Sequence, residues 1–264
     1  MGALVNYVTE KGVALITLND PPVNAYTYEM LKELDAAVLE ARFDNDVHVM
    51  VLTGHGDKFF CAGANINMLR EADPTFKYYF CLHANETLLR LEHTPKLCIA
   101  ALNGHTVGGG LEIALAADLR IARKGAFQIG LPEVALGVLP GTGGTQRLTR
   151  IVGRARAMEL MVEGTNVTME QAQAMGLVHK VWEAESHDDF MKQIMTYAHD
   201  FTPPNKASMA VGRIKRSVHS GSDMALEQGL AFERELQAEL FASQDAKEGL
   251  NAYTQKRKPV FKAR

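Results

Sequence analysis

Two glutamates follow segments of the chain where a carboxylate could act as a general acid or base. Glu112 comes two residues after the last of three successive glycines, and Glu133 follows Pro132 about twenty residues later. Two carboxylates on opposite sides of one pair of reacting carbons could divide the roles of base and acid. The alternative is that both residues only begin helices, and spacing alone favours that alternative for Glu133.

The glycines Gly108, Gly109 and Gly110 stand where an apolar strand over residues 97–102 is expected to give way to a helix. Glycine lets a ligand approach the bare backbone, and the first N–H groups of a helix have no internal partner. An oxygen that becomes negative during a reaction could be held there. Close packing of the chain explains the glycines equally well on this stretch alone.

A second loop of small residues, Cys61 to Asn65, also follows a predicted strand and precedes a predicted helical turn. Two such loops could each supply one backbone N–H, and two converging N–H groups form an oxyanion hole. The gain is greatest for an acyl oxygen that becomes an enolate. Spacing does not establish that the two loops meet.

Composition limits the classes of protein to consider. The chain has 264 residues, 47% of them hydrophobic, a formal net charge of −3 and a pI of about 6.3. This balance argues against a dedicated nucleic-acid binder, and no apolar run approaches the length of a membrane span. Three cysteines without metal spacing, and a strand-like run that starts near Met1, favour a cytoplasmic protein without a targeting peptide.

Strand and helix patterns alternate over the first two-thirds of the chain, which predicts an α/β layered core. The expected strands and helices are a hairpin (5–8 and 13–18), a helix after Thr27, a strand at 47–53, a short strand that opens onto a loop of small residues within 59–66, a helix at 76–91, and strands at 97–102, 119–122 and 126–129. From Pro132 onward the pattern turns helical. We expect residues 1–200 to form the core with the active site, and 201–264 to form a helical oligomerisation or lid region.

Several motifs in this order resemble the crotonase superfamily of acyl-CoA-transforming enzymes, and the enoyl-CoA hydratase branch most closely. Each motif is weak alone, but together they are highly specific, and the resemblance runs nearly end to end. The motifs are Ala62-Gly63-Ala64-Asn65-Ile66, Asn103-Gly-His-Thr-Val-Gly-Gly-Gly-Leu-Glu112, Leu131-Pro-Glu133 and Pro140-Gly-Thr-Gly-Gly-Thr-Gln-Arg-Leu148. The resemblance implies a spiral of strand-strand-helix repeats with a helical C-terminal trimerisation region, assembled as a homotrimer or homohexamer.

The resemblance also implies roles for individual residues. Ala64 and Gly109 would donate their N–H groups to a thioester oxygen, while Glu112 activates water and Glu133 supplies a proton to C2. This hydration of a 2-enoyl-CoA to a 3-hydroxyacyl-CoA needs no metal and no cofactor beyond the CoA of the substrate. Contacts with substrate and CoA would come from Ala25, Ala62, Gly63, Asn65, Ile66, Gly108, Phe241 and Lys256.

Some alternatives remain open at this point. Isomerisation of a double bond, or hydration of a branched or cyclic enoyl-CoA, would use the same scaffold. An RNA-binding role is disfavoured because the helix after Thr27 carries more acidic than basic residues. The loop Pro140-Gly-Thr-Gly-Gly-Thr145 lacks the lysine of a phosphate-binding loop, which favours a structural turn. Asn65 stands where the family commonly has Asp, which we interpret as substrate tuning.

Overall fold

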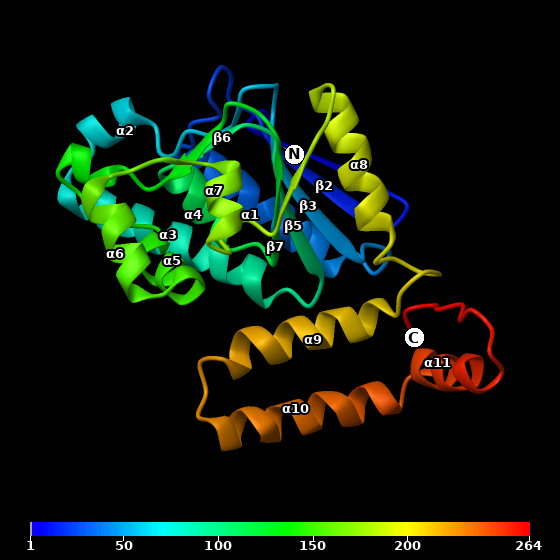
Figure 1. The fold of residues 1–264 in the computed structure, drawn as a ribbon. Helices are drawn as coiled ribbons and strands as arrows, with labels where there is room; N and C mark the ends of the chain where they lie inside the picture. Colours follow the sequence, from blue (N-terminus) through cyan, green and yellow to red (C-terminus); the bar gives the residue numbers. More distant parts are fainter. Residues whose placement is uncertain (1) are drawn as a thin grey trace.

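The computed structural model describes residues 2–264, and its largest element is a six-stranded sheet (Figure 1). Five neighbouring strands run parallel, and the edge strand β1 pairs antiparallel with β2. Because β3 and β5 are buried on both faces, they form nearly continuous apolar runs in the sequence. In spatial order the strands are β1 (Val5–Glu10), β2 (Val13–Leu18), β3 (Val49–Gly54), β5 (Leu97–Leu102), β7 (Leu119–Arg123) and β10 (Lys180–Trp182).

Helices cover both faces of this sheet. Side chains alternate along β3, so Met50 packs with the first helices of the chain while Val51 packs with a later one. Thr27 accepts a hydrogen bond from the Met30 N–H and begins the first helix, as the sequence predicts. The helices on the Met50 face are α1 (Tyr28–Phe43) and α3 (Pro74–His93), and the helix on the Val51 face is α8 (His187–His199).

A second, four-stranded sheet carries the loops of small residues. Its spatial order is β4 (Phe59–Cys61), β6 (His105–Val107), β8 (Gln128–Gly130) and β9 (Val167–Thr168). β4 and β6 are parallel neighbours, so the loops after them leave the sheet at the same edge. The helices that follow these loops are α2 (Ile66–Glu71) and α4 (Gly109–Leu115).

The strand before the three glycines differs from the prediction. We expected residues 97–102 to lead into the helix, but β5 ends at Leu102 and the short strand β6 intervenes. β6 has three residues, too few for an alternating pattern to reveal it. Apart from this, the order β1–β2–α1, β3–β4–α2–α3, β5–β6–α4 confirms the predicted spiral of strand-strand-helix repeats.

The segment that begins at Glu133 is also shorter than predicted. Instead of an α-helix it forms a single 3-10 turn, η1 (Glu133–Leu136), which ends at Gly137 in the left-handed region with φ of 71°. The helices that follow agree with the helical pattern after Pro132, and Thr168 and Gln171 form a capping box. They are α5 (Gly144–Val152), α6 (Arg154–Glu163) and α7 (Met169–Ala174).

The last three helices lie below the sheets in Figure 1. They are α9 (Ser208–Gly221), α10 (Leu226–Phe241) and α11 (Gln244–Thr254). α9 is tied to the body by buried Lys215, whose Nζ lies 3.0 Å from Asp118 Oδ2 and donates to the Leu91 and Lys96 carbonyls. The division of the chain into a core (1–200) and a helical C-terminal region (201–264) stays a prediction. Among residues 2–264, no helix is both long and apolar enough to cross a membrane.

Candidate active site

The loops after β4 and β6 touch each other through backbone atoms. Gly63 has a φ of 94°, and a methyl group added there would lie 3.0 Å from Gly109 N and 3.3 Å from Val107 O. A methyl group on Gly110 would collide with the Cys61 carbonyl. Glycine at these positions therefore allows the close approach that spacing along the sequence did not establish.

Ala64 and Gly109 line one cavity of about 300 Å³. The backbone on either side of Ala64 pairs with Tyr26, whose N–H donates to Gly63 O and whose carbonyl accepts from Asn65 N, both at 2.9 Å. Within residues 2–264, neither the Ala64 N–H nor the Gly109 N–H donates a hydrogen bond to the protein. Two backbone donors in one cavity are thus available to an acceptor that enters it.

Glu112 is buried in α4, and three donors hold its carboxylate. The N–H groups of Thr142 and Gly144 donate to Oε1 at 2.8 and 2.7 Å, and the Thr142 hydroxyl donates to Oε2. Gly144 is the first residue of α5, so one of these N–H groups would otherwise lack a partner. The loop before α5 is therefore a structural turn, as predicted, and its role is to fix the position of Glu112.

Tyr26 lies beside this cluster. Its buried hydroxyl is 3.5 Å from Thr142 Oγ1, and any side chain at position 109 would collide with its ring. Burial, with a smaller effect from the negative charge of Glu112, raises the pKa of Tyr26 well above its ordinary value. The phenol therefore stays protonated and packs the 108–110 loop against the Glu112 site.

Glu133 faces the same cavity from η1, but with few partners of its own. Its Oε2 is buried and has no hydrogen-bond partner among the described residues, 2–264. A methyl group added at Gly108 would lie 3.3 Å from Glu133 Oε1, so the carboxyl adjoins the glycine loop. Burial raises the pKa of Glu133 to about 7, and the charge of Glu112 contributes to the rise. Many molecules therefore keep this proton at neutral pH.

Comparison with known proteins assigns this chain to a family. The family model for enoyl-CoA hydratase/isomerase matches residues 8–264. The chain belongs to the enoyl-CoA hydratase/isomerase family. It has the crotonase fold, because its structure superimposes on an enoyl-CoA hydratase from Geobacillus kaustophilus with a TM-score of 0.95. That match has 44% sequence identity and covers 100% of this chain and 98% of the other.

Curated relatives of this family member also match over nearly their whole length. A short-chain-enoyl-CoA hydratase of Clostridium acetobutylicum is 38% identical over 258 residues, which cover 97% of each chain. A 2,3-dehydroadipyl-CoA hydratase of Escherichia coli is 36% identical over 264 residues, again 97% of each. The chain is therefore an enzyme whose full-length relatives carry the names of hydro-lyases.

The predicted contact residues near the crotonase loops divide into two groups. Ala62, Gly63, Ile66 and Gly108 line the cavity together with Ala64, Gly109 and the two glutamates. Ala25 and Asn65 flank lining residues but do not line the cavity themselves. The Asn65 side chain accepts from the Met68 N–H at 3.1 Å and caps α2. Asn and Asp cap helices about equally well, so either residue would keep this cap, and the interpretation of Asn65 as substrate tuning stays a prediction.

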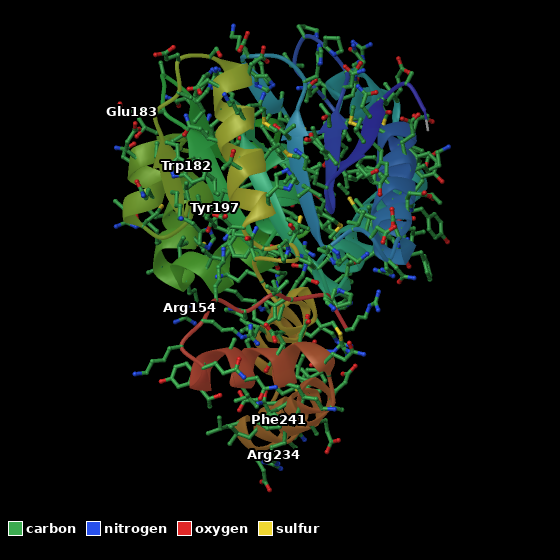
Figure 2. All side chains as sticks on the ribbon, turned by 90° about the vertical axis from the view of Figure 1, so that its right-hand side faces the viewer. Arg154, Trp182, Glu183, Tyr197, Arg234 and Phe241 are labelled. Carbon is green, nitrogen blue, oxygen red and sulfur yellow. The ribbon has the colours of Figure 1, made fainter. Side chains whose placement is uncertain are left out.

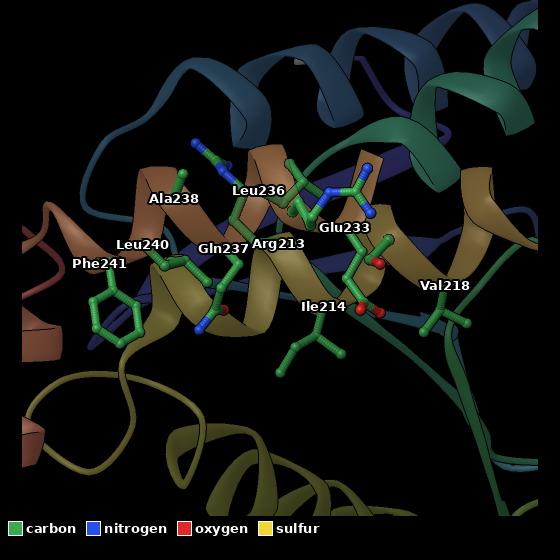
Figure 3. Close-up of a pocket in the computed structure, with 11 residues that line it drawn as sticks. Arg213, Ile214, Val218, Glu233, Leu236, Gln237, Ala238, Leu240 and Phe241 are labelled. Atoms are coloured by element: carbon green, nitrogen blue, oxygen red, sulfur yellow. The ribbon is translucent and has the colours of Figure 1, made fainter. Parts of the chain in front are cut away.

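Phe241 and Lys256 do not line this cavity within a single chain. Phe241 ends α10 and lies among the C-terminal helices, well below the sheets in Figure 2. It lines a groove between α9 and α10, which Figure 3 shows with Ile214 and Val218 along the same side. Lys256 is exposed after α11. Their predicted contacts with CoA therefore stay predictions and would need another subunit.

Three residues with polar side chains in the cavity wall escaped the sequence analysis: Tyr26, Lys77 and Thr142. Thr142 belongs to the 140–145 loop, which the sequence analysis discussed only as a turn. Tyr26 directly follows the predicted contact residue Ala25, but a single aromatic residue forms no sequence pattern that would show which residues it contacts. Lys77 lies in the aromatic segment before Phe80, where helical spacing would have predicted a shared face with Pro74 and Phe80. The remaining wall is mostly apolar and includes Leu69, Ala135, Leu136, Val138 and Leu139.

Proposed function

We propose that this enzyme adds water across the C2–C3 double bond of a 2-enoyl-CoA thioester and forms a 3-hydroxyacyl-CoA. The observation that carries the proposal is a single cavity that contains two free backbone donors, Ala64 N–H and Gly109 N–H, and two carboxyl groups. The donors would hold the thioester oxygen as its negative charge grows in the enolate. Loss of one such donor typically raises a reaction barrier by about 3–4 kcal/mol.

The surroundings of the two glutamates support different roles. Glu112, oriented by Thr142 and Gly144, would accept a proton from water as the water oxygen bonds to C3. The electrons of the double bond move onto the thioester oxygen, and the enolate then takes a proton at C2. A pKa of about 7 suits Glu133 as the donor of that proton. The atoms balance without a metal or redox group, so we propose that no cofactor is needed beyond the CoA of the substrate.

The names of the relatives include a short-chain enoyl-CoA and 2,3-dehydroadipyl-CoA. Both compounds contain the conjugated thioester, and the proposed reaction concerns that shared unit. The deciding experiment incubates the purified protein with crotonyl-CoA and follows the loss of the conjugated thioester absorbance and the gain of one water by mass spectrometry. A product of unchanged mass with a shifted double bond would replace hydration with isomerisation, and no reaction would reject the proposed function.

We also propose that copies of this chain assemble through α9 and α10 into a homotrimer or homohexamer. Large apolar side chains on these helices are exposed in the single chain, among them Ile214, Val218, Leu226 and Phe241, at 60% or more. Single exposed apolar residues are normal on a monomer, whereas several of them on one pair of helices suit a subunit interface. Sedimentation of the purified protein tests this, and a monomer at micromolar concentration would contradict it.

A cytoplasmic location completes the proposal. All three cysteines are free thiols, and Cys61 and Cys98 are buried. Burial raises the pKa of both thiols to about 12, which keeps them in the unreactive form. These features suit a reducing compartment, and cell fractionation followed by immunoblotting tests the location.

A further inference from the structure

Lys77 is the one basic side chain that lines the cavity of Glu112 and Glu133 in the described residues, 2–264. It lies in the first turns of α3 and is only partly exposed to solvent. The neighbouring wall is apolar and includes Leu69 and Leu136. An anion that enters the cavity would meet this ammonium beside an apolar wall, where two opposite charges attract more strongly than in bulk water.

The protein itself supplies no anionic partner for this ammonium. Within residues 2–264, the Lys77 ammonium takes part in no ion pair or hydrogen bond, and the Lys77 backbone N–H donates to the Asp73 carbonyl at 2.9 Å. Its Nζ lies 5.1 Å from the centroid of the buried Phe80 ring, a cation–π contact that leaves the positive charge of Lys77 without a counter-charge. An anion that enters the cavity would therefore meet an available positive charge.

Glu133 does not neutralise Lys77. The charge of Lys77 lowers the pKa of Glu133, but the larger effects of burial leave that pKa at about 7. A carboxyl that still holds its proton when substrate binds carries no negative charge to pair with the lysine. The charge of Lys77 is then unmatched in the state that binds substrate.

We propose that Lys77 binds a carboxylate at the far end of the acyl chain, so that the preferred substrates are 2-enoyl-CoA thioesters of dicarboxylic acids. The apolar wall would contact the methylene groups between the reacting carbons and this carboxylate. The phosphates of CoA are an unsuitable partner because the long pantetheine arm separates them from the thioester. This inference rests on the proposed hydration and narrows its substrate class.

The test compares two six-carbon substrates that differ only at the tail: 2-hexenoyl-CoA, which ends in a methyl group, and 2,3-dehydroadipyl-CoA, which ends in a carboxylate. For Lys77→Met we expect kcat/KM to fall about tenfold to a hundredfold with the carboxylate substrate and less than twofold with hexenoyl-CoA. Lys77→Arg should retain most of the preference. Lys32→Met is the matched control, since Lys32 also lies over an aromatic ring, Tyr28, but outside the cavity.

Other results would overturn the inference in distinguishable ways. An equal rise in KM for both substrates would mean that Lys77 contacts CoA. An equal change in kcat, with a shifted pH profile, would mean that Lys77 acts through Glu133. Wild-type enzyme that hydrates hexenoyl-CoA as well as the carboxylate substrate would reject the tail contact and leave the proposed function intact. If neither thioester is hydrated, both the proposed function and this inference fail.

Discussion

Glu112 and Glu133 line the same cavity, but the protein surrounds them differently. The Glu112 carboxylate accepts from two N–H groups and one hydroxyl, all supplied by Thr142 and Gly144. Its neighbours are packed so closely that a methyl group on Gly144 would lie 3.0 Å from Oε1. Glu133, on a short 3-10 turn, has a buried oxygen without a partner among residues 2–264 and a raised pKa.

This difference shows how one residue type acquires two functions. Donors aimed at a carboxylate favour its acceptor role, whereas burial without donors favours the protonated form. The start of α5 and the loop before it, about thirty residues along the chain, supply the donors to Glu112. Glu133 is instead buried with one carboxyl oxygen, Oε2, that has no partner among residues 2–264. The following four predictions test the contrast, from the largest expected effect to the smallest.

The first prediction concerns turnover. Glu112→Gln and Glu133→Gln should each lower kcat for hydration by about 10²–10⁴-fold, because each removes one proton-transfer group. Binding of a saturated acyl-CoA, measured by calorimetry, should change little. Either variant with the wild-type rate on crotonyl-CoA would show that the two-carboxylate mechanism is wrong.

The second prediction uses pH. Glu133 must be protonated to donate, so kcat/KM should fall above pH 7 and approach a tenfold loss per pH unit. Rates between pH 6 and 9 measure this, with circular dichroism at each pH as the control for folding. A flat profile up to pH 9 would assign the proton donation to another group.

The third prediction concerns stability. Glu112→Gln should destabilise the fold by about 1–3 kcal/mol, because hydrogen bonds to a charged acceptor become bonds to an amide. Glu133→Gln should stabilise it by about 1–2 kcal/mol at pH 8. The folded pKa of Glu133 exceeds its unfolded value, so wild type loses stability as pH rises from 4.5 to 7.

Urea denaturation at pH 8 and pH 5 separates these two effects. The advantage of Glu133→Gln should shrink at pH 5, where the wild-type carboxyl is mostly protonated. The deficit of Glu112→Gln should remain at both values. Equal stability changes for the two variants would remove the contrast between their surroundings.

The smallest effect is expected at Asn65. Asn65→Asp should keep the cap on α2 and change kcat/KM less than threefold, whereas Asn65→Ala should cost about 1 kcal/mol of stability. Crotonyl-CoA kinetics and thermal melting measure the two quantities. A large change in substrate preference for Asn65→Asp would support the interpretation that Asn65 adapts the enzyme to a particular substrate.

Local patterns predicted most of the elements, since their causes lie within a few residues. Thr27 begins α1 because its hydroxyl meets an N–H three residues later, and buried strands such as β3 are apolar throughout. The strand β6 and the short turn after Pro132 were mispredicted because they are too short for periodicity. The family motifs identified the two loops and the two glutamates as candidate site residues. The catalytic roles of these residues stay predictions.

The sequence by itself determined the repeating strands and helices, the small residues of both loops and the presence of two acids. Only the tertiary structure decided that Gly63 touches Gly109, that Thr142 and Gly144 hold Glu112, and that Lys77 faces the same cavity. These contacts join segments about thirty or more residues apart. Their formation depends on how the two sheets pack together, and no local propensity encodes that packing.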